Sequence, residues 1–93
     1  MTDIQLEDFG NRGRYVYAME GAEAELTFVR SGDHEIVVDH TFVPPAWRGR
    51  GIAEKLVRHV VEEARAHGFK IRPVCPYVVV AFRRHPEWAD IHA

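Results

Sequence analysis

The chain has 93 residues, of which 46% are hydrophobic and 28% charged, and its formal net charge is −2 at pH 7. This composition is typical of a folded domain, predicted to span residues 1–93, and excludes a disordered chain. The balanced charge gives no support for a nucleic-acid partner, no apolar run reaches the roughly 20 residues of a membrane span, and the lack of a signal-peptide pattern predicts the cytoplasm.

The first half of the chain predicts an antiparallel β-meander. Residues 1–12 are polar with spaced apolar side chains, which is typical of an edge strand or an extended arm. Larger and smaller side chains then alternate in three segments with turn residues between them, the first turn at residues 11–13. The three predicted strands cover residues 14–20, 22–30 and 34–43.

A helix is predicted after Pro44 and Pro45, which end the third strand because proline cannot donate to a β-ladder. Apolar side chains recur at helical spacing from about residue 51 to residue 67, and charged side chains occupy the opposite face. Gly68 is suited to the C-terminal end of this helix. The apolar side chains are those of Ile52, Leu56, Val57, Val60, Val61 and Ala64.

The last third of the chain completes a βαβ unit. Residues 69–75 are rich in apolar side chains and predict a strand. A strand, a helix and a strand in series give a right-handed crossover, so this strand is expected parallel to residues 36–43. A final helix is predicted over residues 76–84, with Pro76 at its favoured first position, and Trp88 is expected to pack on the core. The predicted fold class is α/β (α+β), a meander followed by a βαβ unit and a C-terminal helix.

The loop at residues 48–53 has the composition of an anion-binding site. Its sequence is RGRGIA, and the predicted helix begins inside it. Glycine allows a tight turn and close approach of a ligand, and the first N–H groups of a helix have no intrahelical acceptor. Arg48 and Arg50 add positive charge, so the loop predicts a phosphate or pyrophosphate ligand. The alternative is a glycine-containing helix start with two solvated arginines.

Two better-known phosphate-binding motifs are excluded. A P-loop needs G-x-x-x-x-G-K-[ST], and the chain contains no Gly-Lys pair. A dinucleotide-binding fingerprint needs a third glycine where this loop has Glu54, and a larger βαβ sheet than the remaining chain can build.

Four separated motifs carry a resemblance to a known family. They are HTFVP at residues 40–44, RGRGIA at residues 48–53, P-x-C-x-Y-V at residues 73–78 and HPEW at residues 85–88. They resemble the Gcn5-related N-acetyltransferases in a miniature branch, and Arg48, Gly51 and Ala53 fit the family motif [QR]-x-x-G-x-[GA]. The chain lacks the helical pair between the first strands of larger relatives and their two last strands, which help to shape the acceptor side.

The resemblance implies acetyl-coenzyme A as the cofactor. In this family the two parallel strands splay apart, and the pantetheine arm pairs with free backbone groups of the first strand, like an added strand. The pyrophosphate is expected on the loop, and the thioester near Thr41, Cys75 and Tyr77. The cofactor-binding residues implied in this way are Thr41, Phe42, Val43, Arg48, Gly49, Arg50, Gly51, Ile52 and Ala53.

Three side chains near this expected site are candidates for catalysis. Cys75, the only cysteine, precedes the last helix, whose dipole stabilises a thiolate, so it is a candidate nucleophile; the alternative is a small buried apolar side chain. His40 is a candidate general base, or a strand histidine with a satisfied hydrogen bond. Tyr77 is a candidate for stabilising or protonating the leaving thiolate, or a packing residue. The other five histidines show no metal-ligand spacing, so no metal site is predicted.

The leading hypothesis is an acetyl-coenzyme A-dependent N-acetyltransferase, acting by direct attack of the amine or through an acetylated Cys75. The alternative is a non-catalytic module that binds coenzyme A or acyl-coenzyme A as a sensor or partner protein. A small protein-interaction domain is a third class, which has no need of the cationic glycine loop. The expected acceptor is an amine, on a small molecule or on a protein lysine, and the expected assembly is a monomer or a weak dimer.

Overall fold

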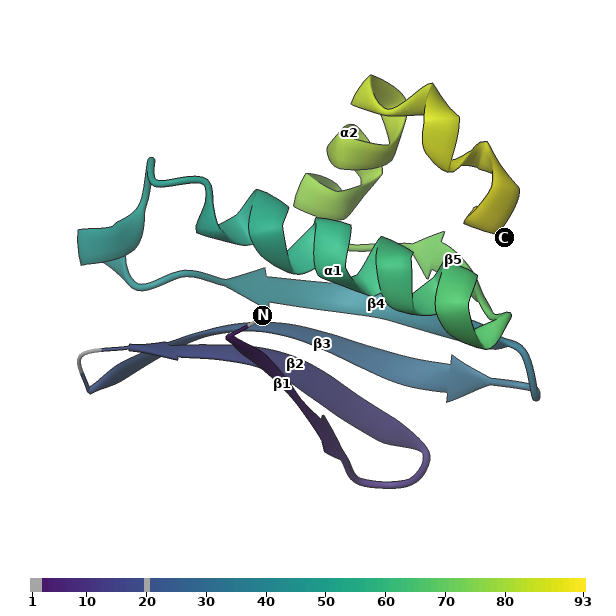
Figure 1. The fold of residues 1–93 in the computed structure, drawn as a ribbon, viewed down its shortest axis with the longest axis horizontal. Helices are drawn as coiled ribbons and strands as arrows, with labels where there is room; N and C mark the ends of the chain where they lie inside the picture. The colour runs from purple at the N-terminus through teal and green to yellow at the C-terminus, as the bar shows by residue number, and fades with distance from the viewer. Residues whose placement is uncertain (1–2, 20) are drawn as a thin grey trace.

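The computed structural model of the chain describes residues 3–19 and 21–93. Glu20, predicted to end a strand, and the first two residues of the predicted N-terminal arm lie outside the described residues. The described residues form one mixed β-sheet with the helices gathered on one of its faces (Figure 1). None of the helices in this part of the chain is long and apolar enough to cross a membrane.

The sheet confirms the predicted order of elements. Its strands are β1 (Ile4–Asp8), β2 (Arg12–Met19), β3 (Ala22–Ser31), β4 (Glu35–Phe42) and β5 (Lys70–Pro73). Each strand pairs with the next one in sequence, antiparallel from β1 to β4 and parallel between β4 and β5. The segment expected as an edge strand or an arm is therefore the edge strand β1.

Helices α1 (Ile52–His67) and α2 (Pro76–Arg84) also match their predicted ranges, α1 to within one residue at its start. Two short 3₁₀ helices accompany them, η1 (Pro45–Trp47) and η2 (Pro86–Ile91). Gly68 ends α1 with a φ of 77°, a left-handed conformation that glycine adopts without steric cost.

The hydrophobic core lies between α1 and the sheet. The apolar stripe predicted for α1 is the face that it buries, and Leu56 at its centre has no exposed surface. Leu26 and Phe28 on β3 and Val38 on β4 are 2% exposed or less and belong to the same cluster. Burial of each such side chain contributes roughly 1.5–3 kcal/mol, so this contact holds α1 in place across the sheet.

The two parallel strands part after a short pairing. The pairing of β4 with β5 ends at Val38, whose carbonyl oxygen accepts hydrogen bonds from the backbone N–H groups of Val74 and Cys75, both at 3.0 Å. On its other side β4 carries a bulge: Thr27 pairs with His40 while Phe28 pairs with Val38. The bulge leaves Asp39 as the extra residue, and such a residue bends and twists its strand. The end of β4 beyond Val38 therefore has its backbone open on the β5 side.

The predicted turn at residues 11–13 is wrong in position. Arg12 and Gly13 belong to β2, and the turn lies earlier, where Gly10 has a φ of 88°. Gly13 serves packing: a Cβ atom at this position would lie 2.7 Å from Cζ of Phe28. A glycine that gives room to a ring and a glycine that forms a turn look alike in the sequence.

The C-terminal segment folds back on the molecule. Trp88 is 3% exposed and its ring lies 5.2 Å from that of Phe82, which confirms the predicted packing. The sequence did not predict the 3₁₀ helix η2 that carries Trp88. Beyond it, the N–H of Ala93 donates to the carbonyl oxygen of Ile71 at 2.8 Å, so the end of the chain covers part of the outer edge of β5.

We expect Leu56→Ala to lower the free energy of unfolding by about 2–5 kcal/mol, because it leaves a cavity in a site that has no exposed surface. Urea denaturation followed by circular dichroism measures this loss. Glu62→Ala, on the exposed face of the same helix, is the matched control and should keep the wild-type midpoint. Equal stability of the two variants would contradict the placement of the core.

Candidate functional site

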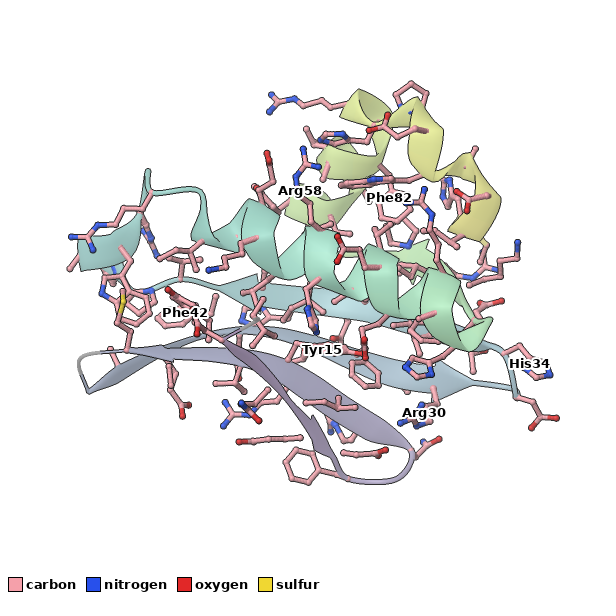
Figure 2. All side chains as sticks on the ribbon, in the orientation of Figure 1. Tyr15, Arg30, His34, Phe42, Arg58 and Phe82 are labelled. Atoms are coloured by element: carbon pink, nitrogen blue, oxygen red, sulfur yellow. The ribbon has the colours of Figure 1, made fainter. Side chains whose placement is uncertain are left out.

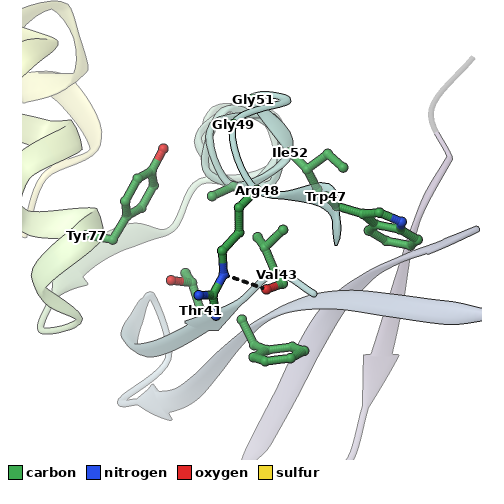
Figure 3. A pocket seen from close by; sticks show the side chains of 10 residues that line it. Thr41, Val43, Trp47, Arg48, Gly49, Gly51, Ile52 and Tyr77 are labelled. Carbon is green, nitrogen blue, oxygen red and sulfur yellow. Dashed lines mark hydrogen bonds between the residues drawn. The ribbon is translucent and has the colours of Figure 1, made fainter. Parts of the chain in front are cut away.

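A cavity of about 440 Å³ lies where the end of β4, the glycine loop and α2 come together (Figure 3). Its walls come from segments that are far apart in the sequence and meet only because β4 and β5 separate. The lining residues are Thr41, Phe42, Val43, Trp47, Arg48, Gly49, Gly51, Ile52, Ala53 and Tyr77. The structure thus brings together every residue expected to bind the cofactor except Arg50, and adds Trp47 and Tyr77 to them.

The start of α1 presents unpaired N–H groups to this cavity. The first intrahelical hydrogen bond runs from the N–H of Lys55 to the carbonyl oxygen of Gly51 at 3.0 Å. The N–H groups of the three preceding residues have no such acceptor, which is the general condition of a helix start. Gly51 holds a φ of 75°, which turns the chain into the helix at a position that other residues rarely adopt. The arrangement suits an anion.

The two arginines of the loop are placed differently. Nε of Arg48 donates a hydrogen bond of 3.2 Å to the carbonyl oxygen of Val43, so its side chain lies across the cavity (Figure 3). Arg50 is exposed and does not line the cavity. Both are cations close to the start of α1, and Glu54 in the first turn is paired with Arg58 at 2.9 Å, which offsets its negative charge.

Apolar side chains close one side of the cavity. Trp47, the last residue of η1, is 4% exposed, and its ring meets that of Tyr17 edge-on with 6.2 Å between centroids. Ile52 is also buried and lines the same side. Trp47 thus occupies the apolar edge of the site.

Cys75 lies beneath the cavity and does not line it. The residue is 7% exposed, and its Sγ is 3.5 Å from Oγ1 of Thr41. This contact joins the end of β4 to the residue before α2, across the gap between the parting strands. Thr41 therefore lies between the Cys75 thiol and the cavity, which Thr41 itself lines.

Tyr77 is 42% exposed and stands on the α2 side of the cavity. Partial burial raises the pKa of its hydroxyl, the negative charge of Glu54 raises it further, and the positive charge of Arg84 opposes this. Because the ordinary value is already near 10, the hydroxyl is protonated at neutral pH and can donate a proton or a hydrogen bond.

His40 lies on the other face of the sheet. It pairs with Thr27, whose neighbours Leu26 and Phe28 point into the core, and side chains alternate between the two faces of a strand. His40 is exposed there, on the face of the sheet opposite to α1 and α2. The structure therefore separates His40 from Cys75 and Tyr77, with β4 itself between them.

The influence of Arg84 on Tyr77 was not predicted from the sequence. The two residues are seven positions apart on α2, which places them on the same face two turns apart. That spacing was a usable signal once the helix had been predicted. Among the described residues, no group of three or more His, Cys, Asp or Glu side chains is placed to hold a metal ion.

With this geometry in hand, comparison with known proteins decides the family. The profile of the GCN5-related N-acetyl-transferase family matches residues 14–91. The chain belongs to this family. The resemblance seen in the four sequence motifs is thereby confirmed at the level of the superfamily, whose name states its reaction, N-acetyl transfer.

Two relatives match over most of their own lengths. Protein NATD1 of Gallus gallus is 28% identical over 85 residues, which are 89% of this chain and 77% of that protein. A GCN5-like protein from Staphylococcus aureus, solved by NMR, superimposes with a TM-score of 0.73 at 26% identity and covers 100% of this chain and 91% of its own. The second comparison confirms the predicted minimal version of the fold.

Two more distant structures share the fold. The IAA acetyltransferase from Bacillus cereus gives a TM-score of 0.62 at 20% identity, over 83% of this chain and 53% of that chain. AAC(6')-Iy, solved with the bisubstrate analogue CoA-S-monomethyl-acetylneamine, gives 0.57 at 16% identity, over 85% and 61%. This chain therefore spans little more than half the length of these two enzymes.

We expect Gly51→Val to weaken coenzyme A binding at least tenfold, or about 1.4 kcal/mol. A side chain here would stand among the unpaired N–H groups, and its backbone could not hold a φ of 75° without strain. Isothermal titration measures the affinity. Gly32→Val is the matched control, because Gly32 has a similar φ of 68° and equally open surroundings in a remote turn. Equal affinity in the two variants would remove the loop from the binding site.

Proposed function

We propose that this chain is an acetyl-coenzyme A-dependent N-acetyltransferase that acts on an amine acceptor. The observation that carries the proposal is the cavity in which the open end of β4 meets the unpaired N–H groups of α1. One extended ligand with a phosphate group and an amide-containing arm would satisfy both. Membership of the acetyltransferase family supports acetyl-coenzyme A as that ligand.

The residues of the cavity fit the parts of coenzyme A. The pyrophosphate would lie on the N–H groups at the start of α1, with Arg48 and Arg50 as counter-charges. The pantetheine arm would run along the backbone of residues 41–43, where the pairing with β5 has already ended at Val38. To expose the carbonyl oxygen of Val43, Arg48 would give up its hydrogen bond to that atom and turn to the pyrophosphate.

In the direct route the acceptor nitrogen attacks the carbonyl carbon of the thioester. A C–N bond forms, the C–S bond breaks, and the thiolate that leaves takes a proton. Tyr77 would supply it, because the residue lines the cavity and its hydroxyl is protonated at neutral pH. The acceptor would arrive from the uncovered face of the sheet, where the exposed His40 can take the proton that the amine loses.

The second route uses Cys75. Its thiolate would attack the thioester, take the acetyl group by thioester exchange, and pass it to the amine in a second step. Proximity to Thr41 supports this route, since Thr41 lines the cavity and its hydroxyl lies 3.5 Å from the thiol. Burial opposes it, because the 7% exposed sulfur would need an opening movement to reach the carbonyl carbon.

A non-catalytic module that binds coenzyme A is the second candidate function. It is favoured by the separation of the three candidate catalytic side chains, with Cys75 beneath the cavity and His40 on the opposite face. Turnover with any amine acceptor decides between the two candidates. For either one, we propose a single domain over residues 1–93, a monomer or weak dimer, and a place in the cytoplasm.

Replacement of Arg48 and Arg50 by alanine should weaken coenzyme A by about tenfold and leave pantetheine almost unaffected. The reason is that pantetheine lacks the pyrophosphate that the guanidinium groups would hold through charge-assisted hydrogen bonds. Competition titration with both ligands measures the difference. Arg12→Ala, an exposed arginine on β2, is the control. An equal loss for both ligands would contradict this placement of the pyrophosphate.

The two routes predict opposite results for Cys75→Ala. If the thiol carries the acetyl group, acetyl-coenzyme A alone should add one acetyl group to the intact protein, and Cys75→Ala should lose both this mass and nearly all turnover. In the direct route no such adduct forms and Cys75→Ala remains active. His40→Ala and Tyr77→Phe should then each lower kcat by about 100-fold, the usual contribution of acid–base catalysis. Normal turnover in all three variants would refute all three assignments.

A further inference from the structure

A second cavity, of about 250 Å³, lies under the C-terminal half of α1. Tyr15 and Arg30, which both line it, stand together below that half of the helix in Figure 2. Ile52 lines the first cavity and Glu63 lines the second, and these two residues are eleven positions apart on α1, or about 16 Å. Among the described residues, the two cavities share no lining side chain. The second cavity is therefore separate from the proposed cofactor site.

Apolar side chains form most of the wall of this second cavity. Phe28 and Ile36 are 2% and 3% exposed, and Leu6 and Phe69 lie closer to the opening. The ring of Tyr15 lies 5.5 Å from that of Phe28. An apolar cavity of about 150 Å³ is enough to bind benzene, so this cavity has room for one aromatic ring with small substituents. Such a ring would meet the aromatic walls in the edge-on or offset arrangements that aromatic pairs prefer.

The Tyr15 hydroxyl is a buried polar group in this apolar wall. Tyr15 is 3% exposed, and no described residue forms a hydrogen bond with its hydroxyl. In this part of the chain no side-chain nitrogen or oxygen is both fully enclosed and without a partner, so the hydroxyl must reach the space of the cavity. Buried hydroxyls almost always have a hydrogen-bond partner, because an unpaired one is costly. The partner of this one has to enter the cavity.

Glu63 is the second polar group available to a ligand. Burial raises the pKa of the Tyr15 hydroxyl to about 12, and the negative charge of Glu63 adds to the rise, so the hydroxyl is protonated at neutral pH. No described residue donates a hydrogen bond to the Glu63 carboxylate, and its ion pair with His67 is 3.8 Å long, which exceeds hydrogen-bond range. The cavity therefore offers one hydroxyl donor and one carboxylate acceptor.

Arg30 contributes a charge to the cavity while its guanidinium is held elsewhere. It donates to the carbonyl oxygen of Gly10 at 2.8 Å and to Asp8 at 2.7 Å, and it lies 5.5 Å from the centre of the Phe28 ring. Its positive charge lowers the pKa of the Tyr15 hydroxyl, against burial and Glu63. A ligand at this hydroxyl thus meets opposite charges on two sides, and this disfavours both a carboxylate and an ammonium group.

We propose that the second cavity binds a small neutral molecule, a single aromatic ring that carries a hydroxyl group. The ring packs among Leu6, Phe28 and Phe69. The ligand hydroxyl accepts a hydrogen bond from Tyr15 and donates one to Glu63, so both polar groups gain the partner that the protein does not supply. A phenylalanine ring from a second copy of the chain, such as the 65% exposed Phe9, would fill the space but leave the Tyr15 hydroxyl unpaired.

The test is a titration of ¹⁵N-labelled protein, followed by NMR, with p-cresol, benzoate and benzylammonium. Wild-type protein should bind p-cresol with a dissociation constant of about 1 mM or below, a realistic affinity for so small a ligand. The amide signals of Leu6, Phe28 and Phe69 should move. The two charged ligands should bind at least about tenfold more weakly, because each meets a like charge beside the hydroxyl.

Two pairs of variants test the polar contacts. Tyr15→Phe should weaken p-cresol about fivefold, the usual effect of one lost hydrogen bond. Tyr17→Phe is its control, because Tyr17 lies two residues along β2 with its ring against Trp47 at the other end of the molecule. Glu63→Gln should strengthen benzoate about tenfold by removing the like charge, whereas Glu62→Gln, on the exposed face of α1, should not.

Four results would overturn the proposal, and each leaves the proposed function in place. They are no binding of p-cresol, equal binding of all three ligands, an equal effect of Tyr15→Phe and Tyr17→Phe, and shifts at Thr41 and Gly51 with displacement by coenzyme A. The last result would place the ligand in the cofactor cavity. A dimer in size-exclusion chromatography that p-cresol dissociates would assign the cavity to Phe9 of a second copy, and would overturn the proposal as well.

Discussion

The separation of β4 from β5 at Val38 is the constraint on which the rest of the site depends. The backbone N–H groups of Val74 and Cys75 both donate to the Val38 carbonyl oxygen. Beyond this point the segment after β5 turns into α2, while β4 continues without a partner on that side. The bulge at Asp39 bends β4 at the same level. Because the two strands diverge beyond these hydrogen bonds, a gap opens between them although the hydrophobic core of the domain is intact.

The hydrophobic core determines what faces this gap. Burial of the apolar stripe of α1 against β3 and β4 fixes the line of the helix across the sheet, and that line brings its N-terminal end to the open edge of β4. The unpaired N–H groups thus reach the cavity as a consequence of packing. Gly51, with its left-handed backbone, completes the connection, so the stability of the fold and the geometry of the loop depend on separate residues.

Because side chains alternate along β4, its two faces have different surroundings. Thr41 faces the helices and meets Cys75, while His40 faces the uncovered side of the sheet. A ligand held among the helices and an acceptor arriving at the open face would approach the same gap from opposite sides. The two more distant enzymes are matched over only 53% and 61% of their own lengths.

The sequence by itself determined the elements, their order and the glycine-rich loop before α1, because these depend on local periodicity, proline and glycine. Helix α2 was predicted from Pro76 to Arg84, as the structure has it. The turn near Gly13 was misplaced, because the glycine there makes room for the Phe28 ring on another strand. Only the tertiary structure decided that Cys75 lies beneath Thr41 and that His40 faces away. These positions follow from the register between β3, β4 and β5, and register is set by the packing of the whole sheet, which no single segment encodes.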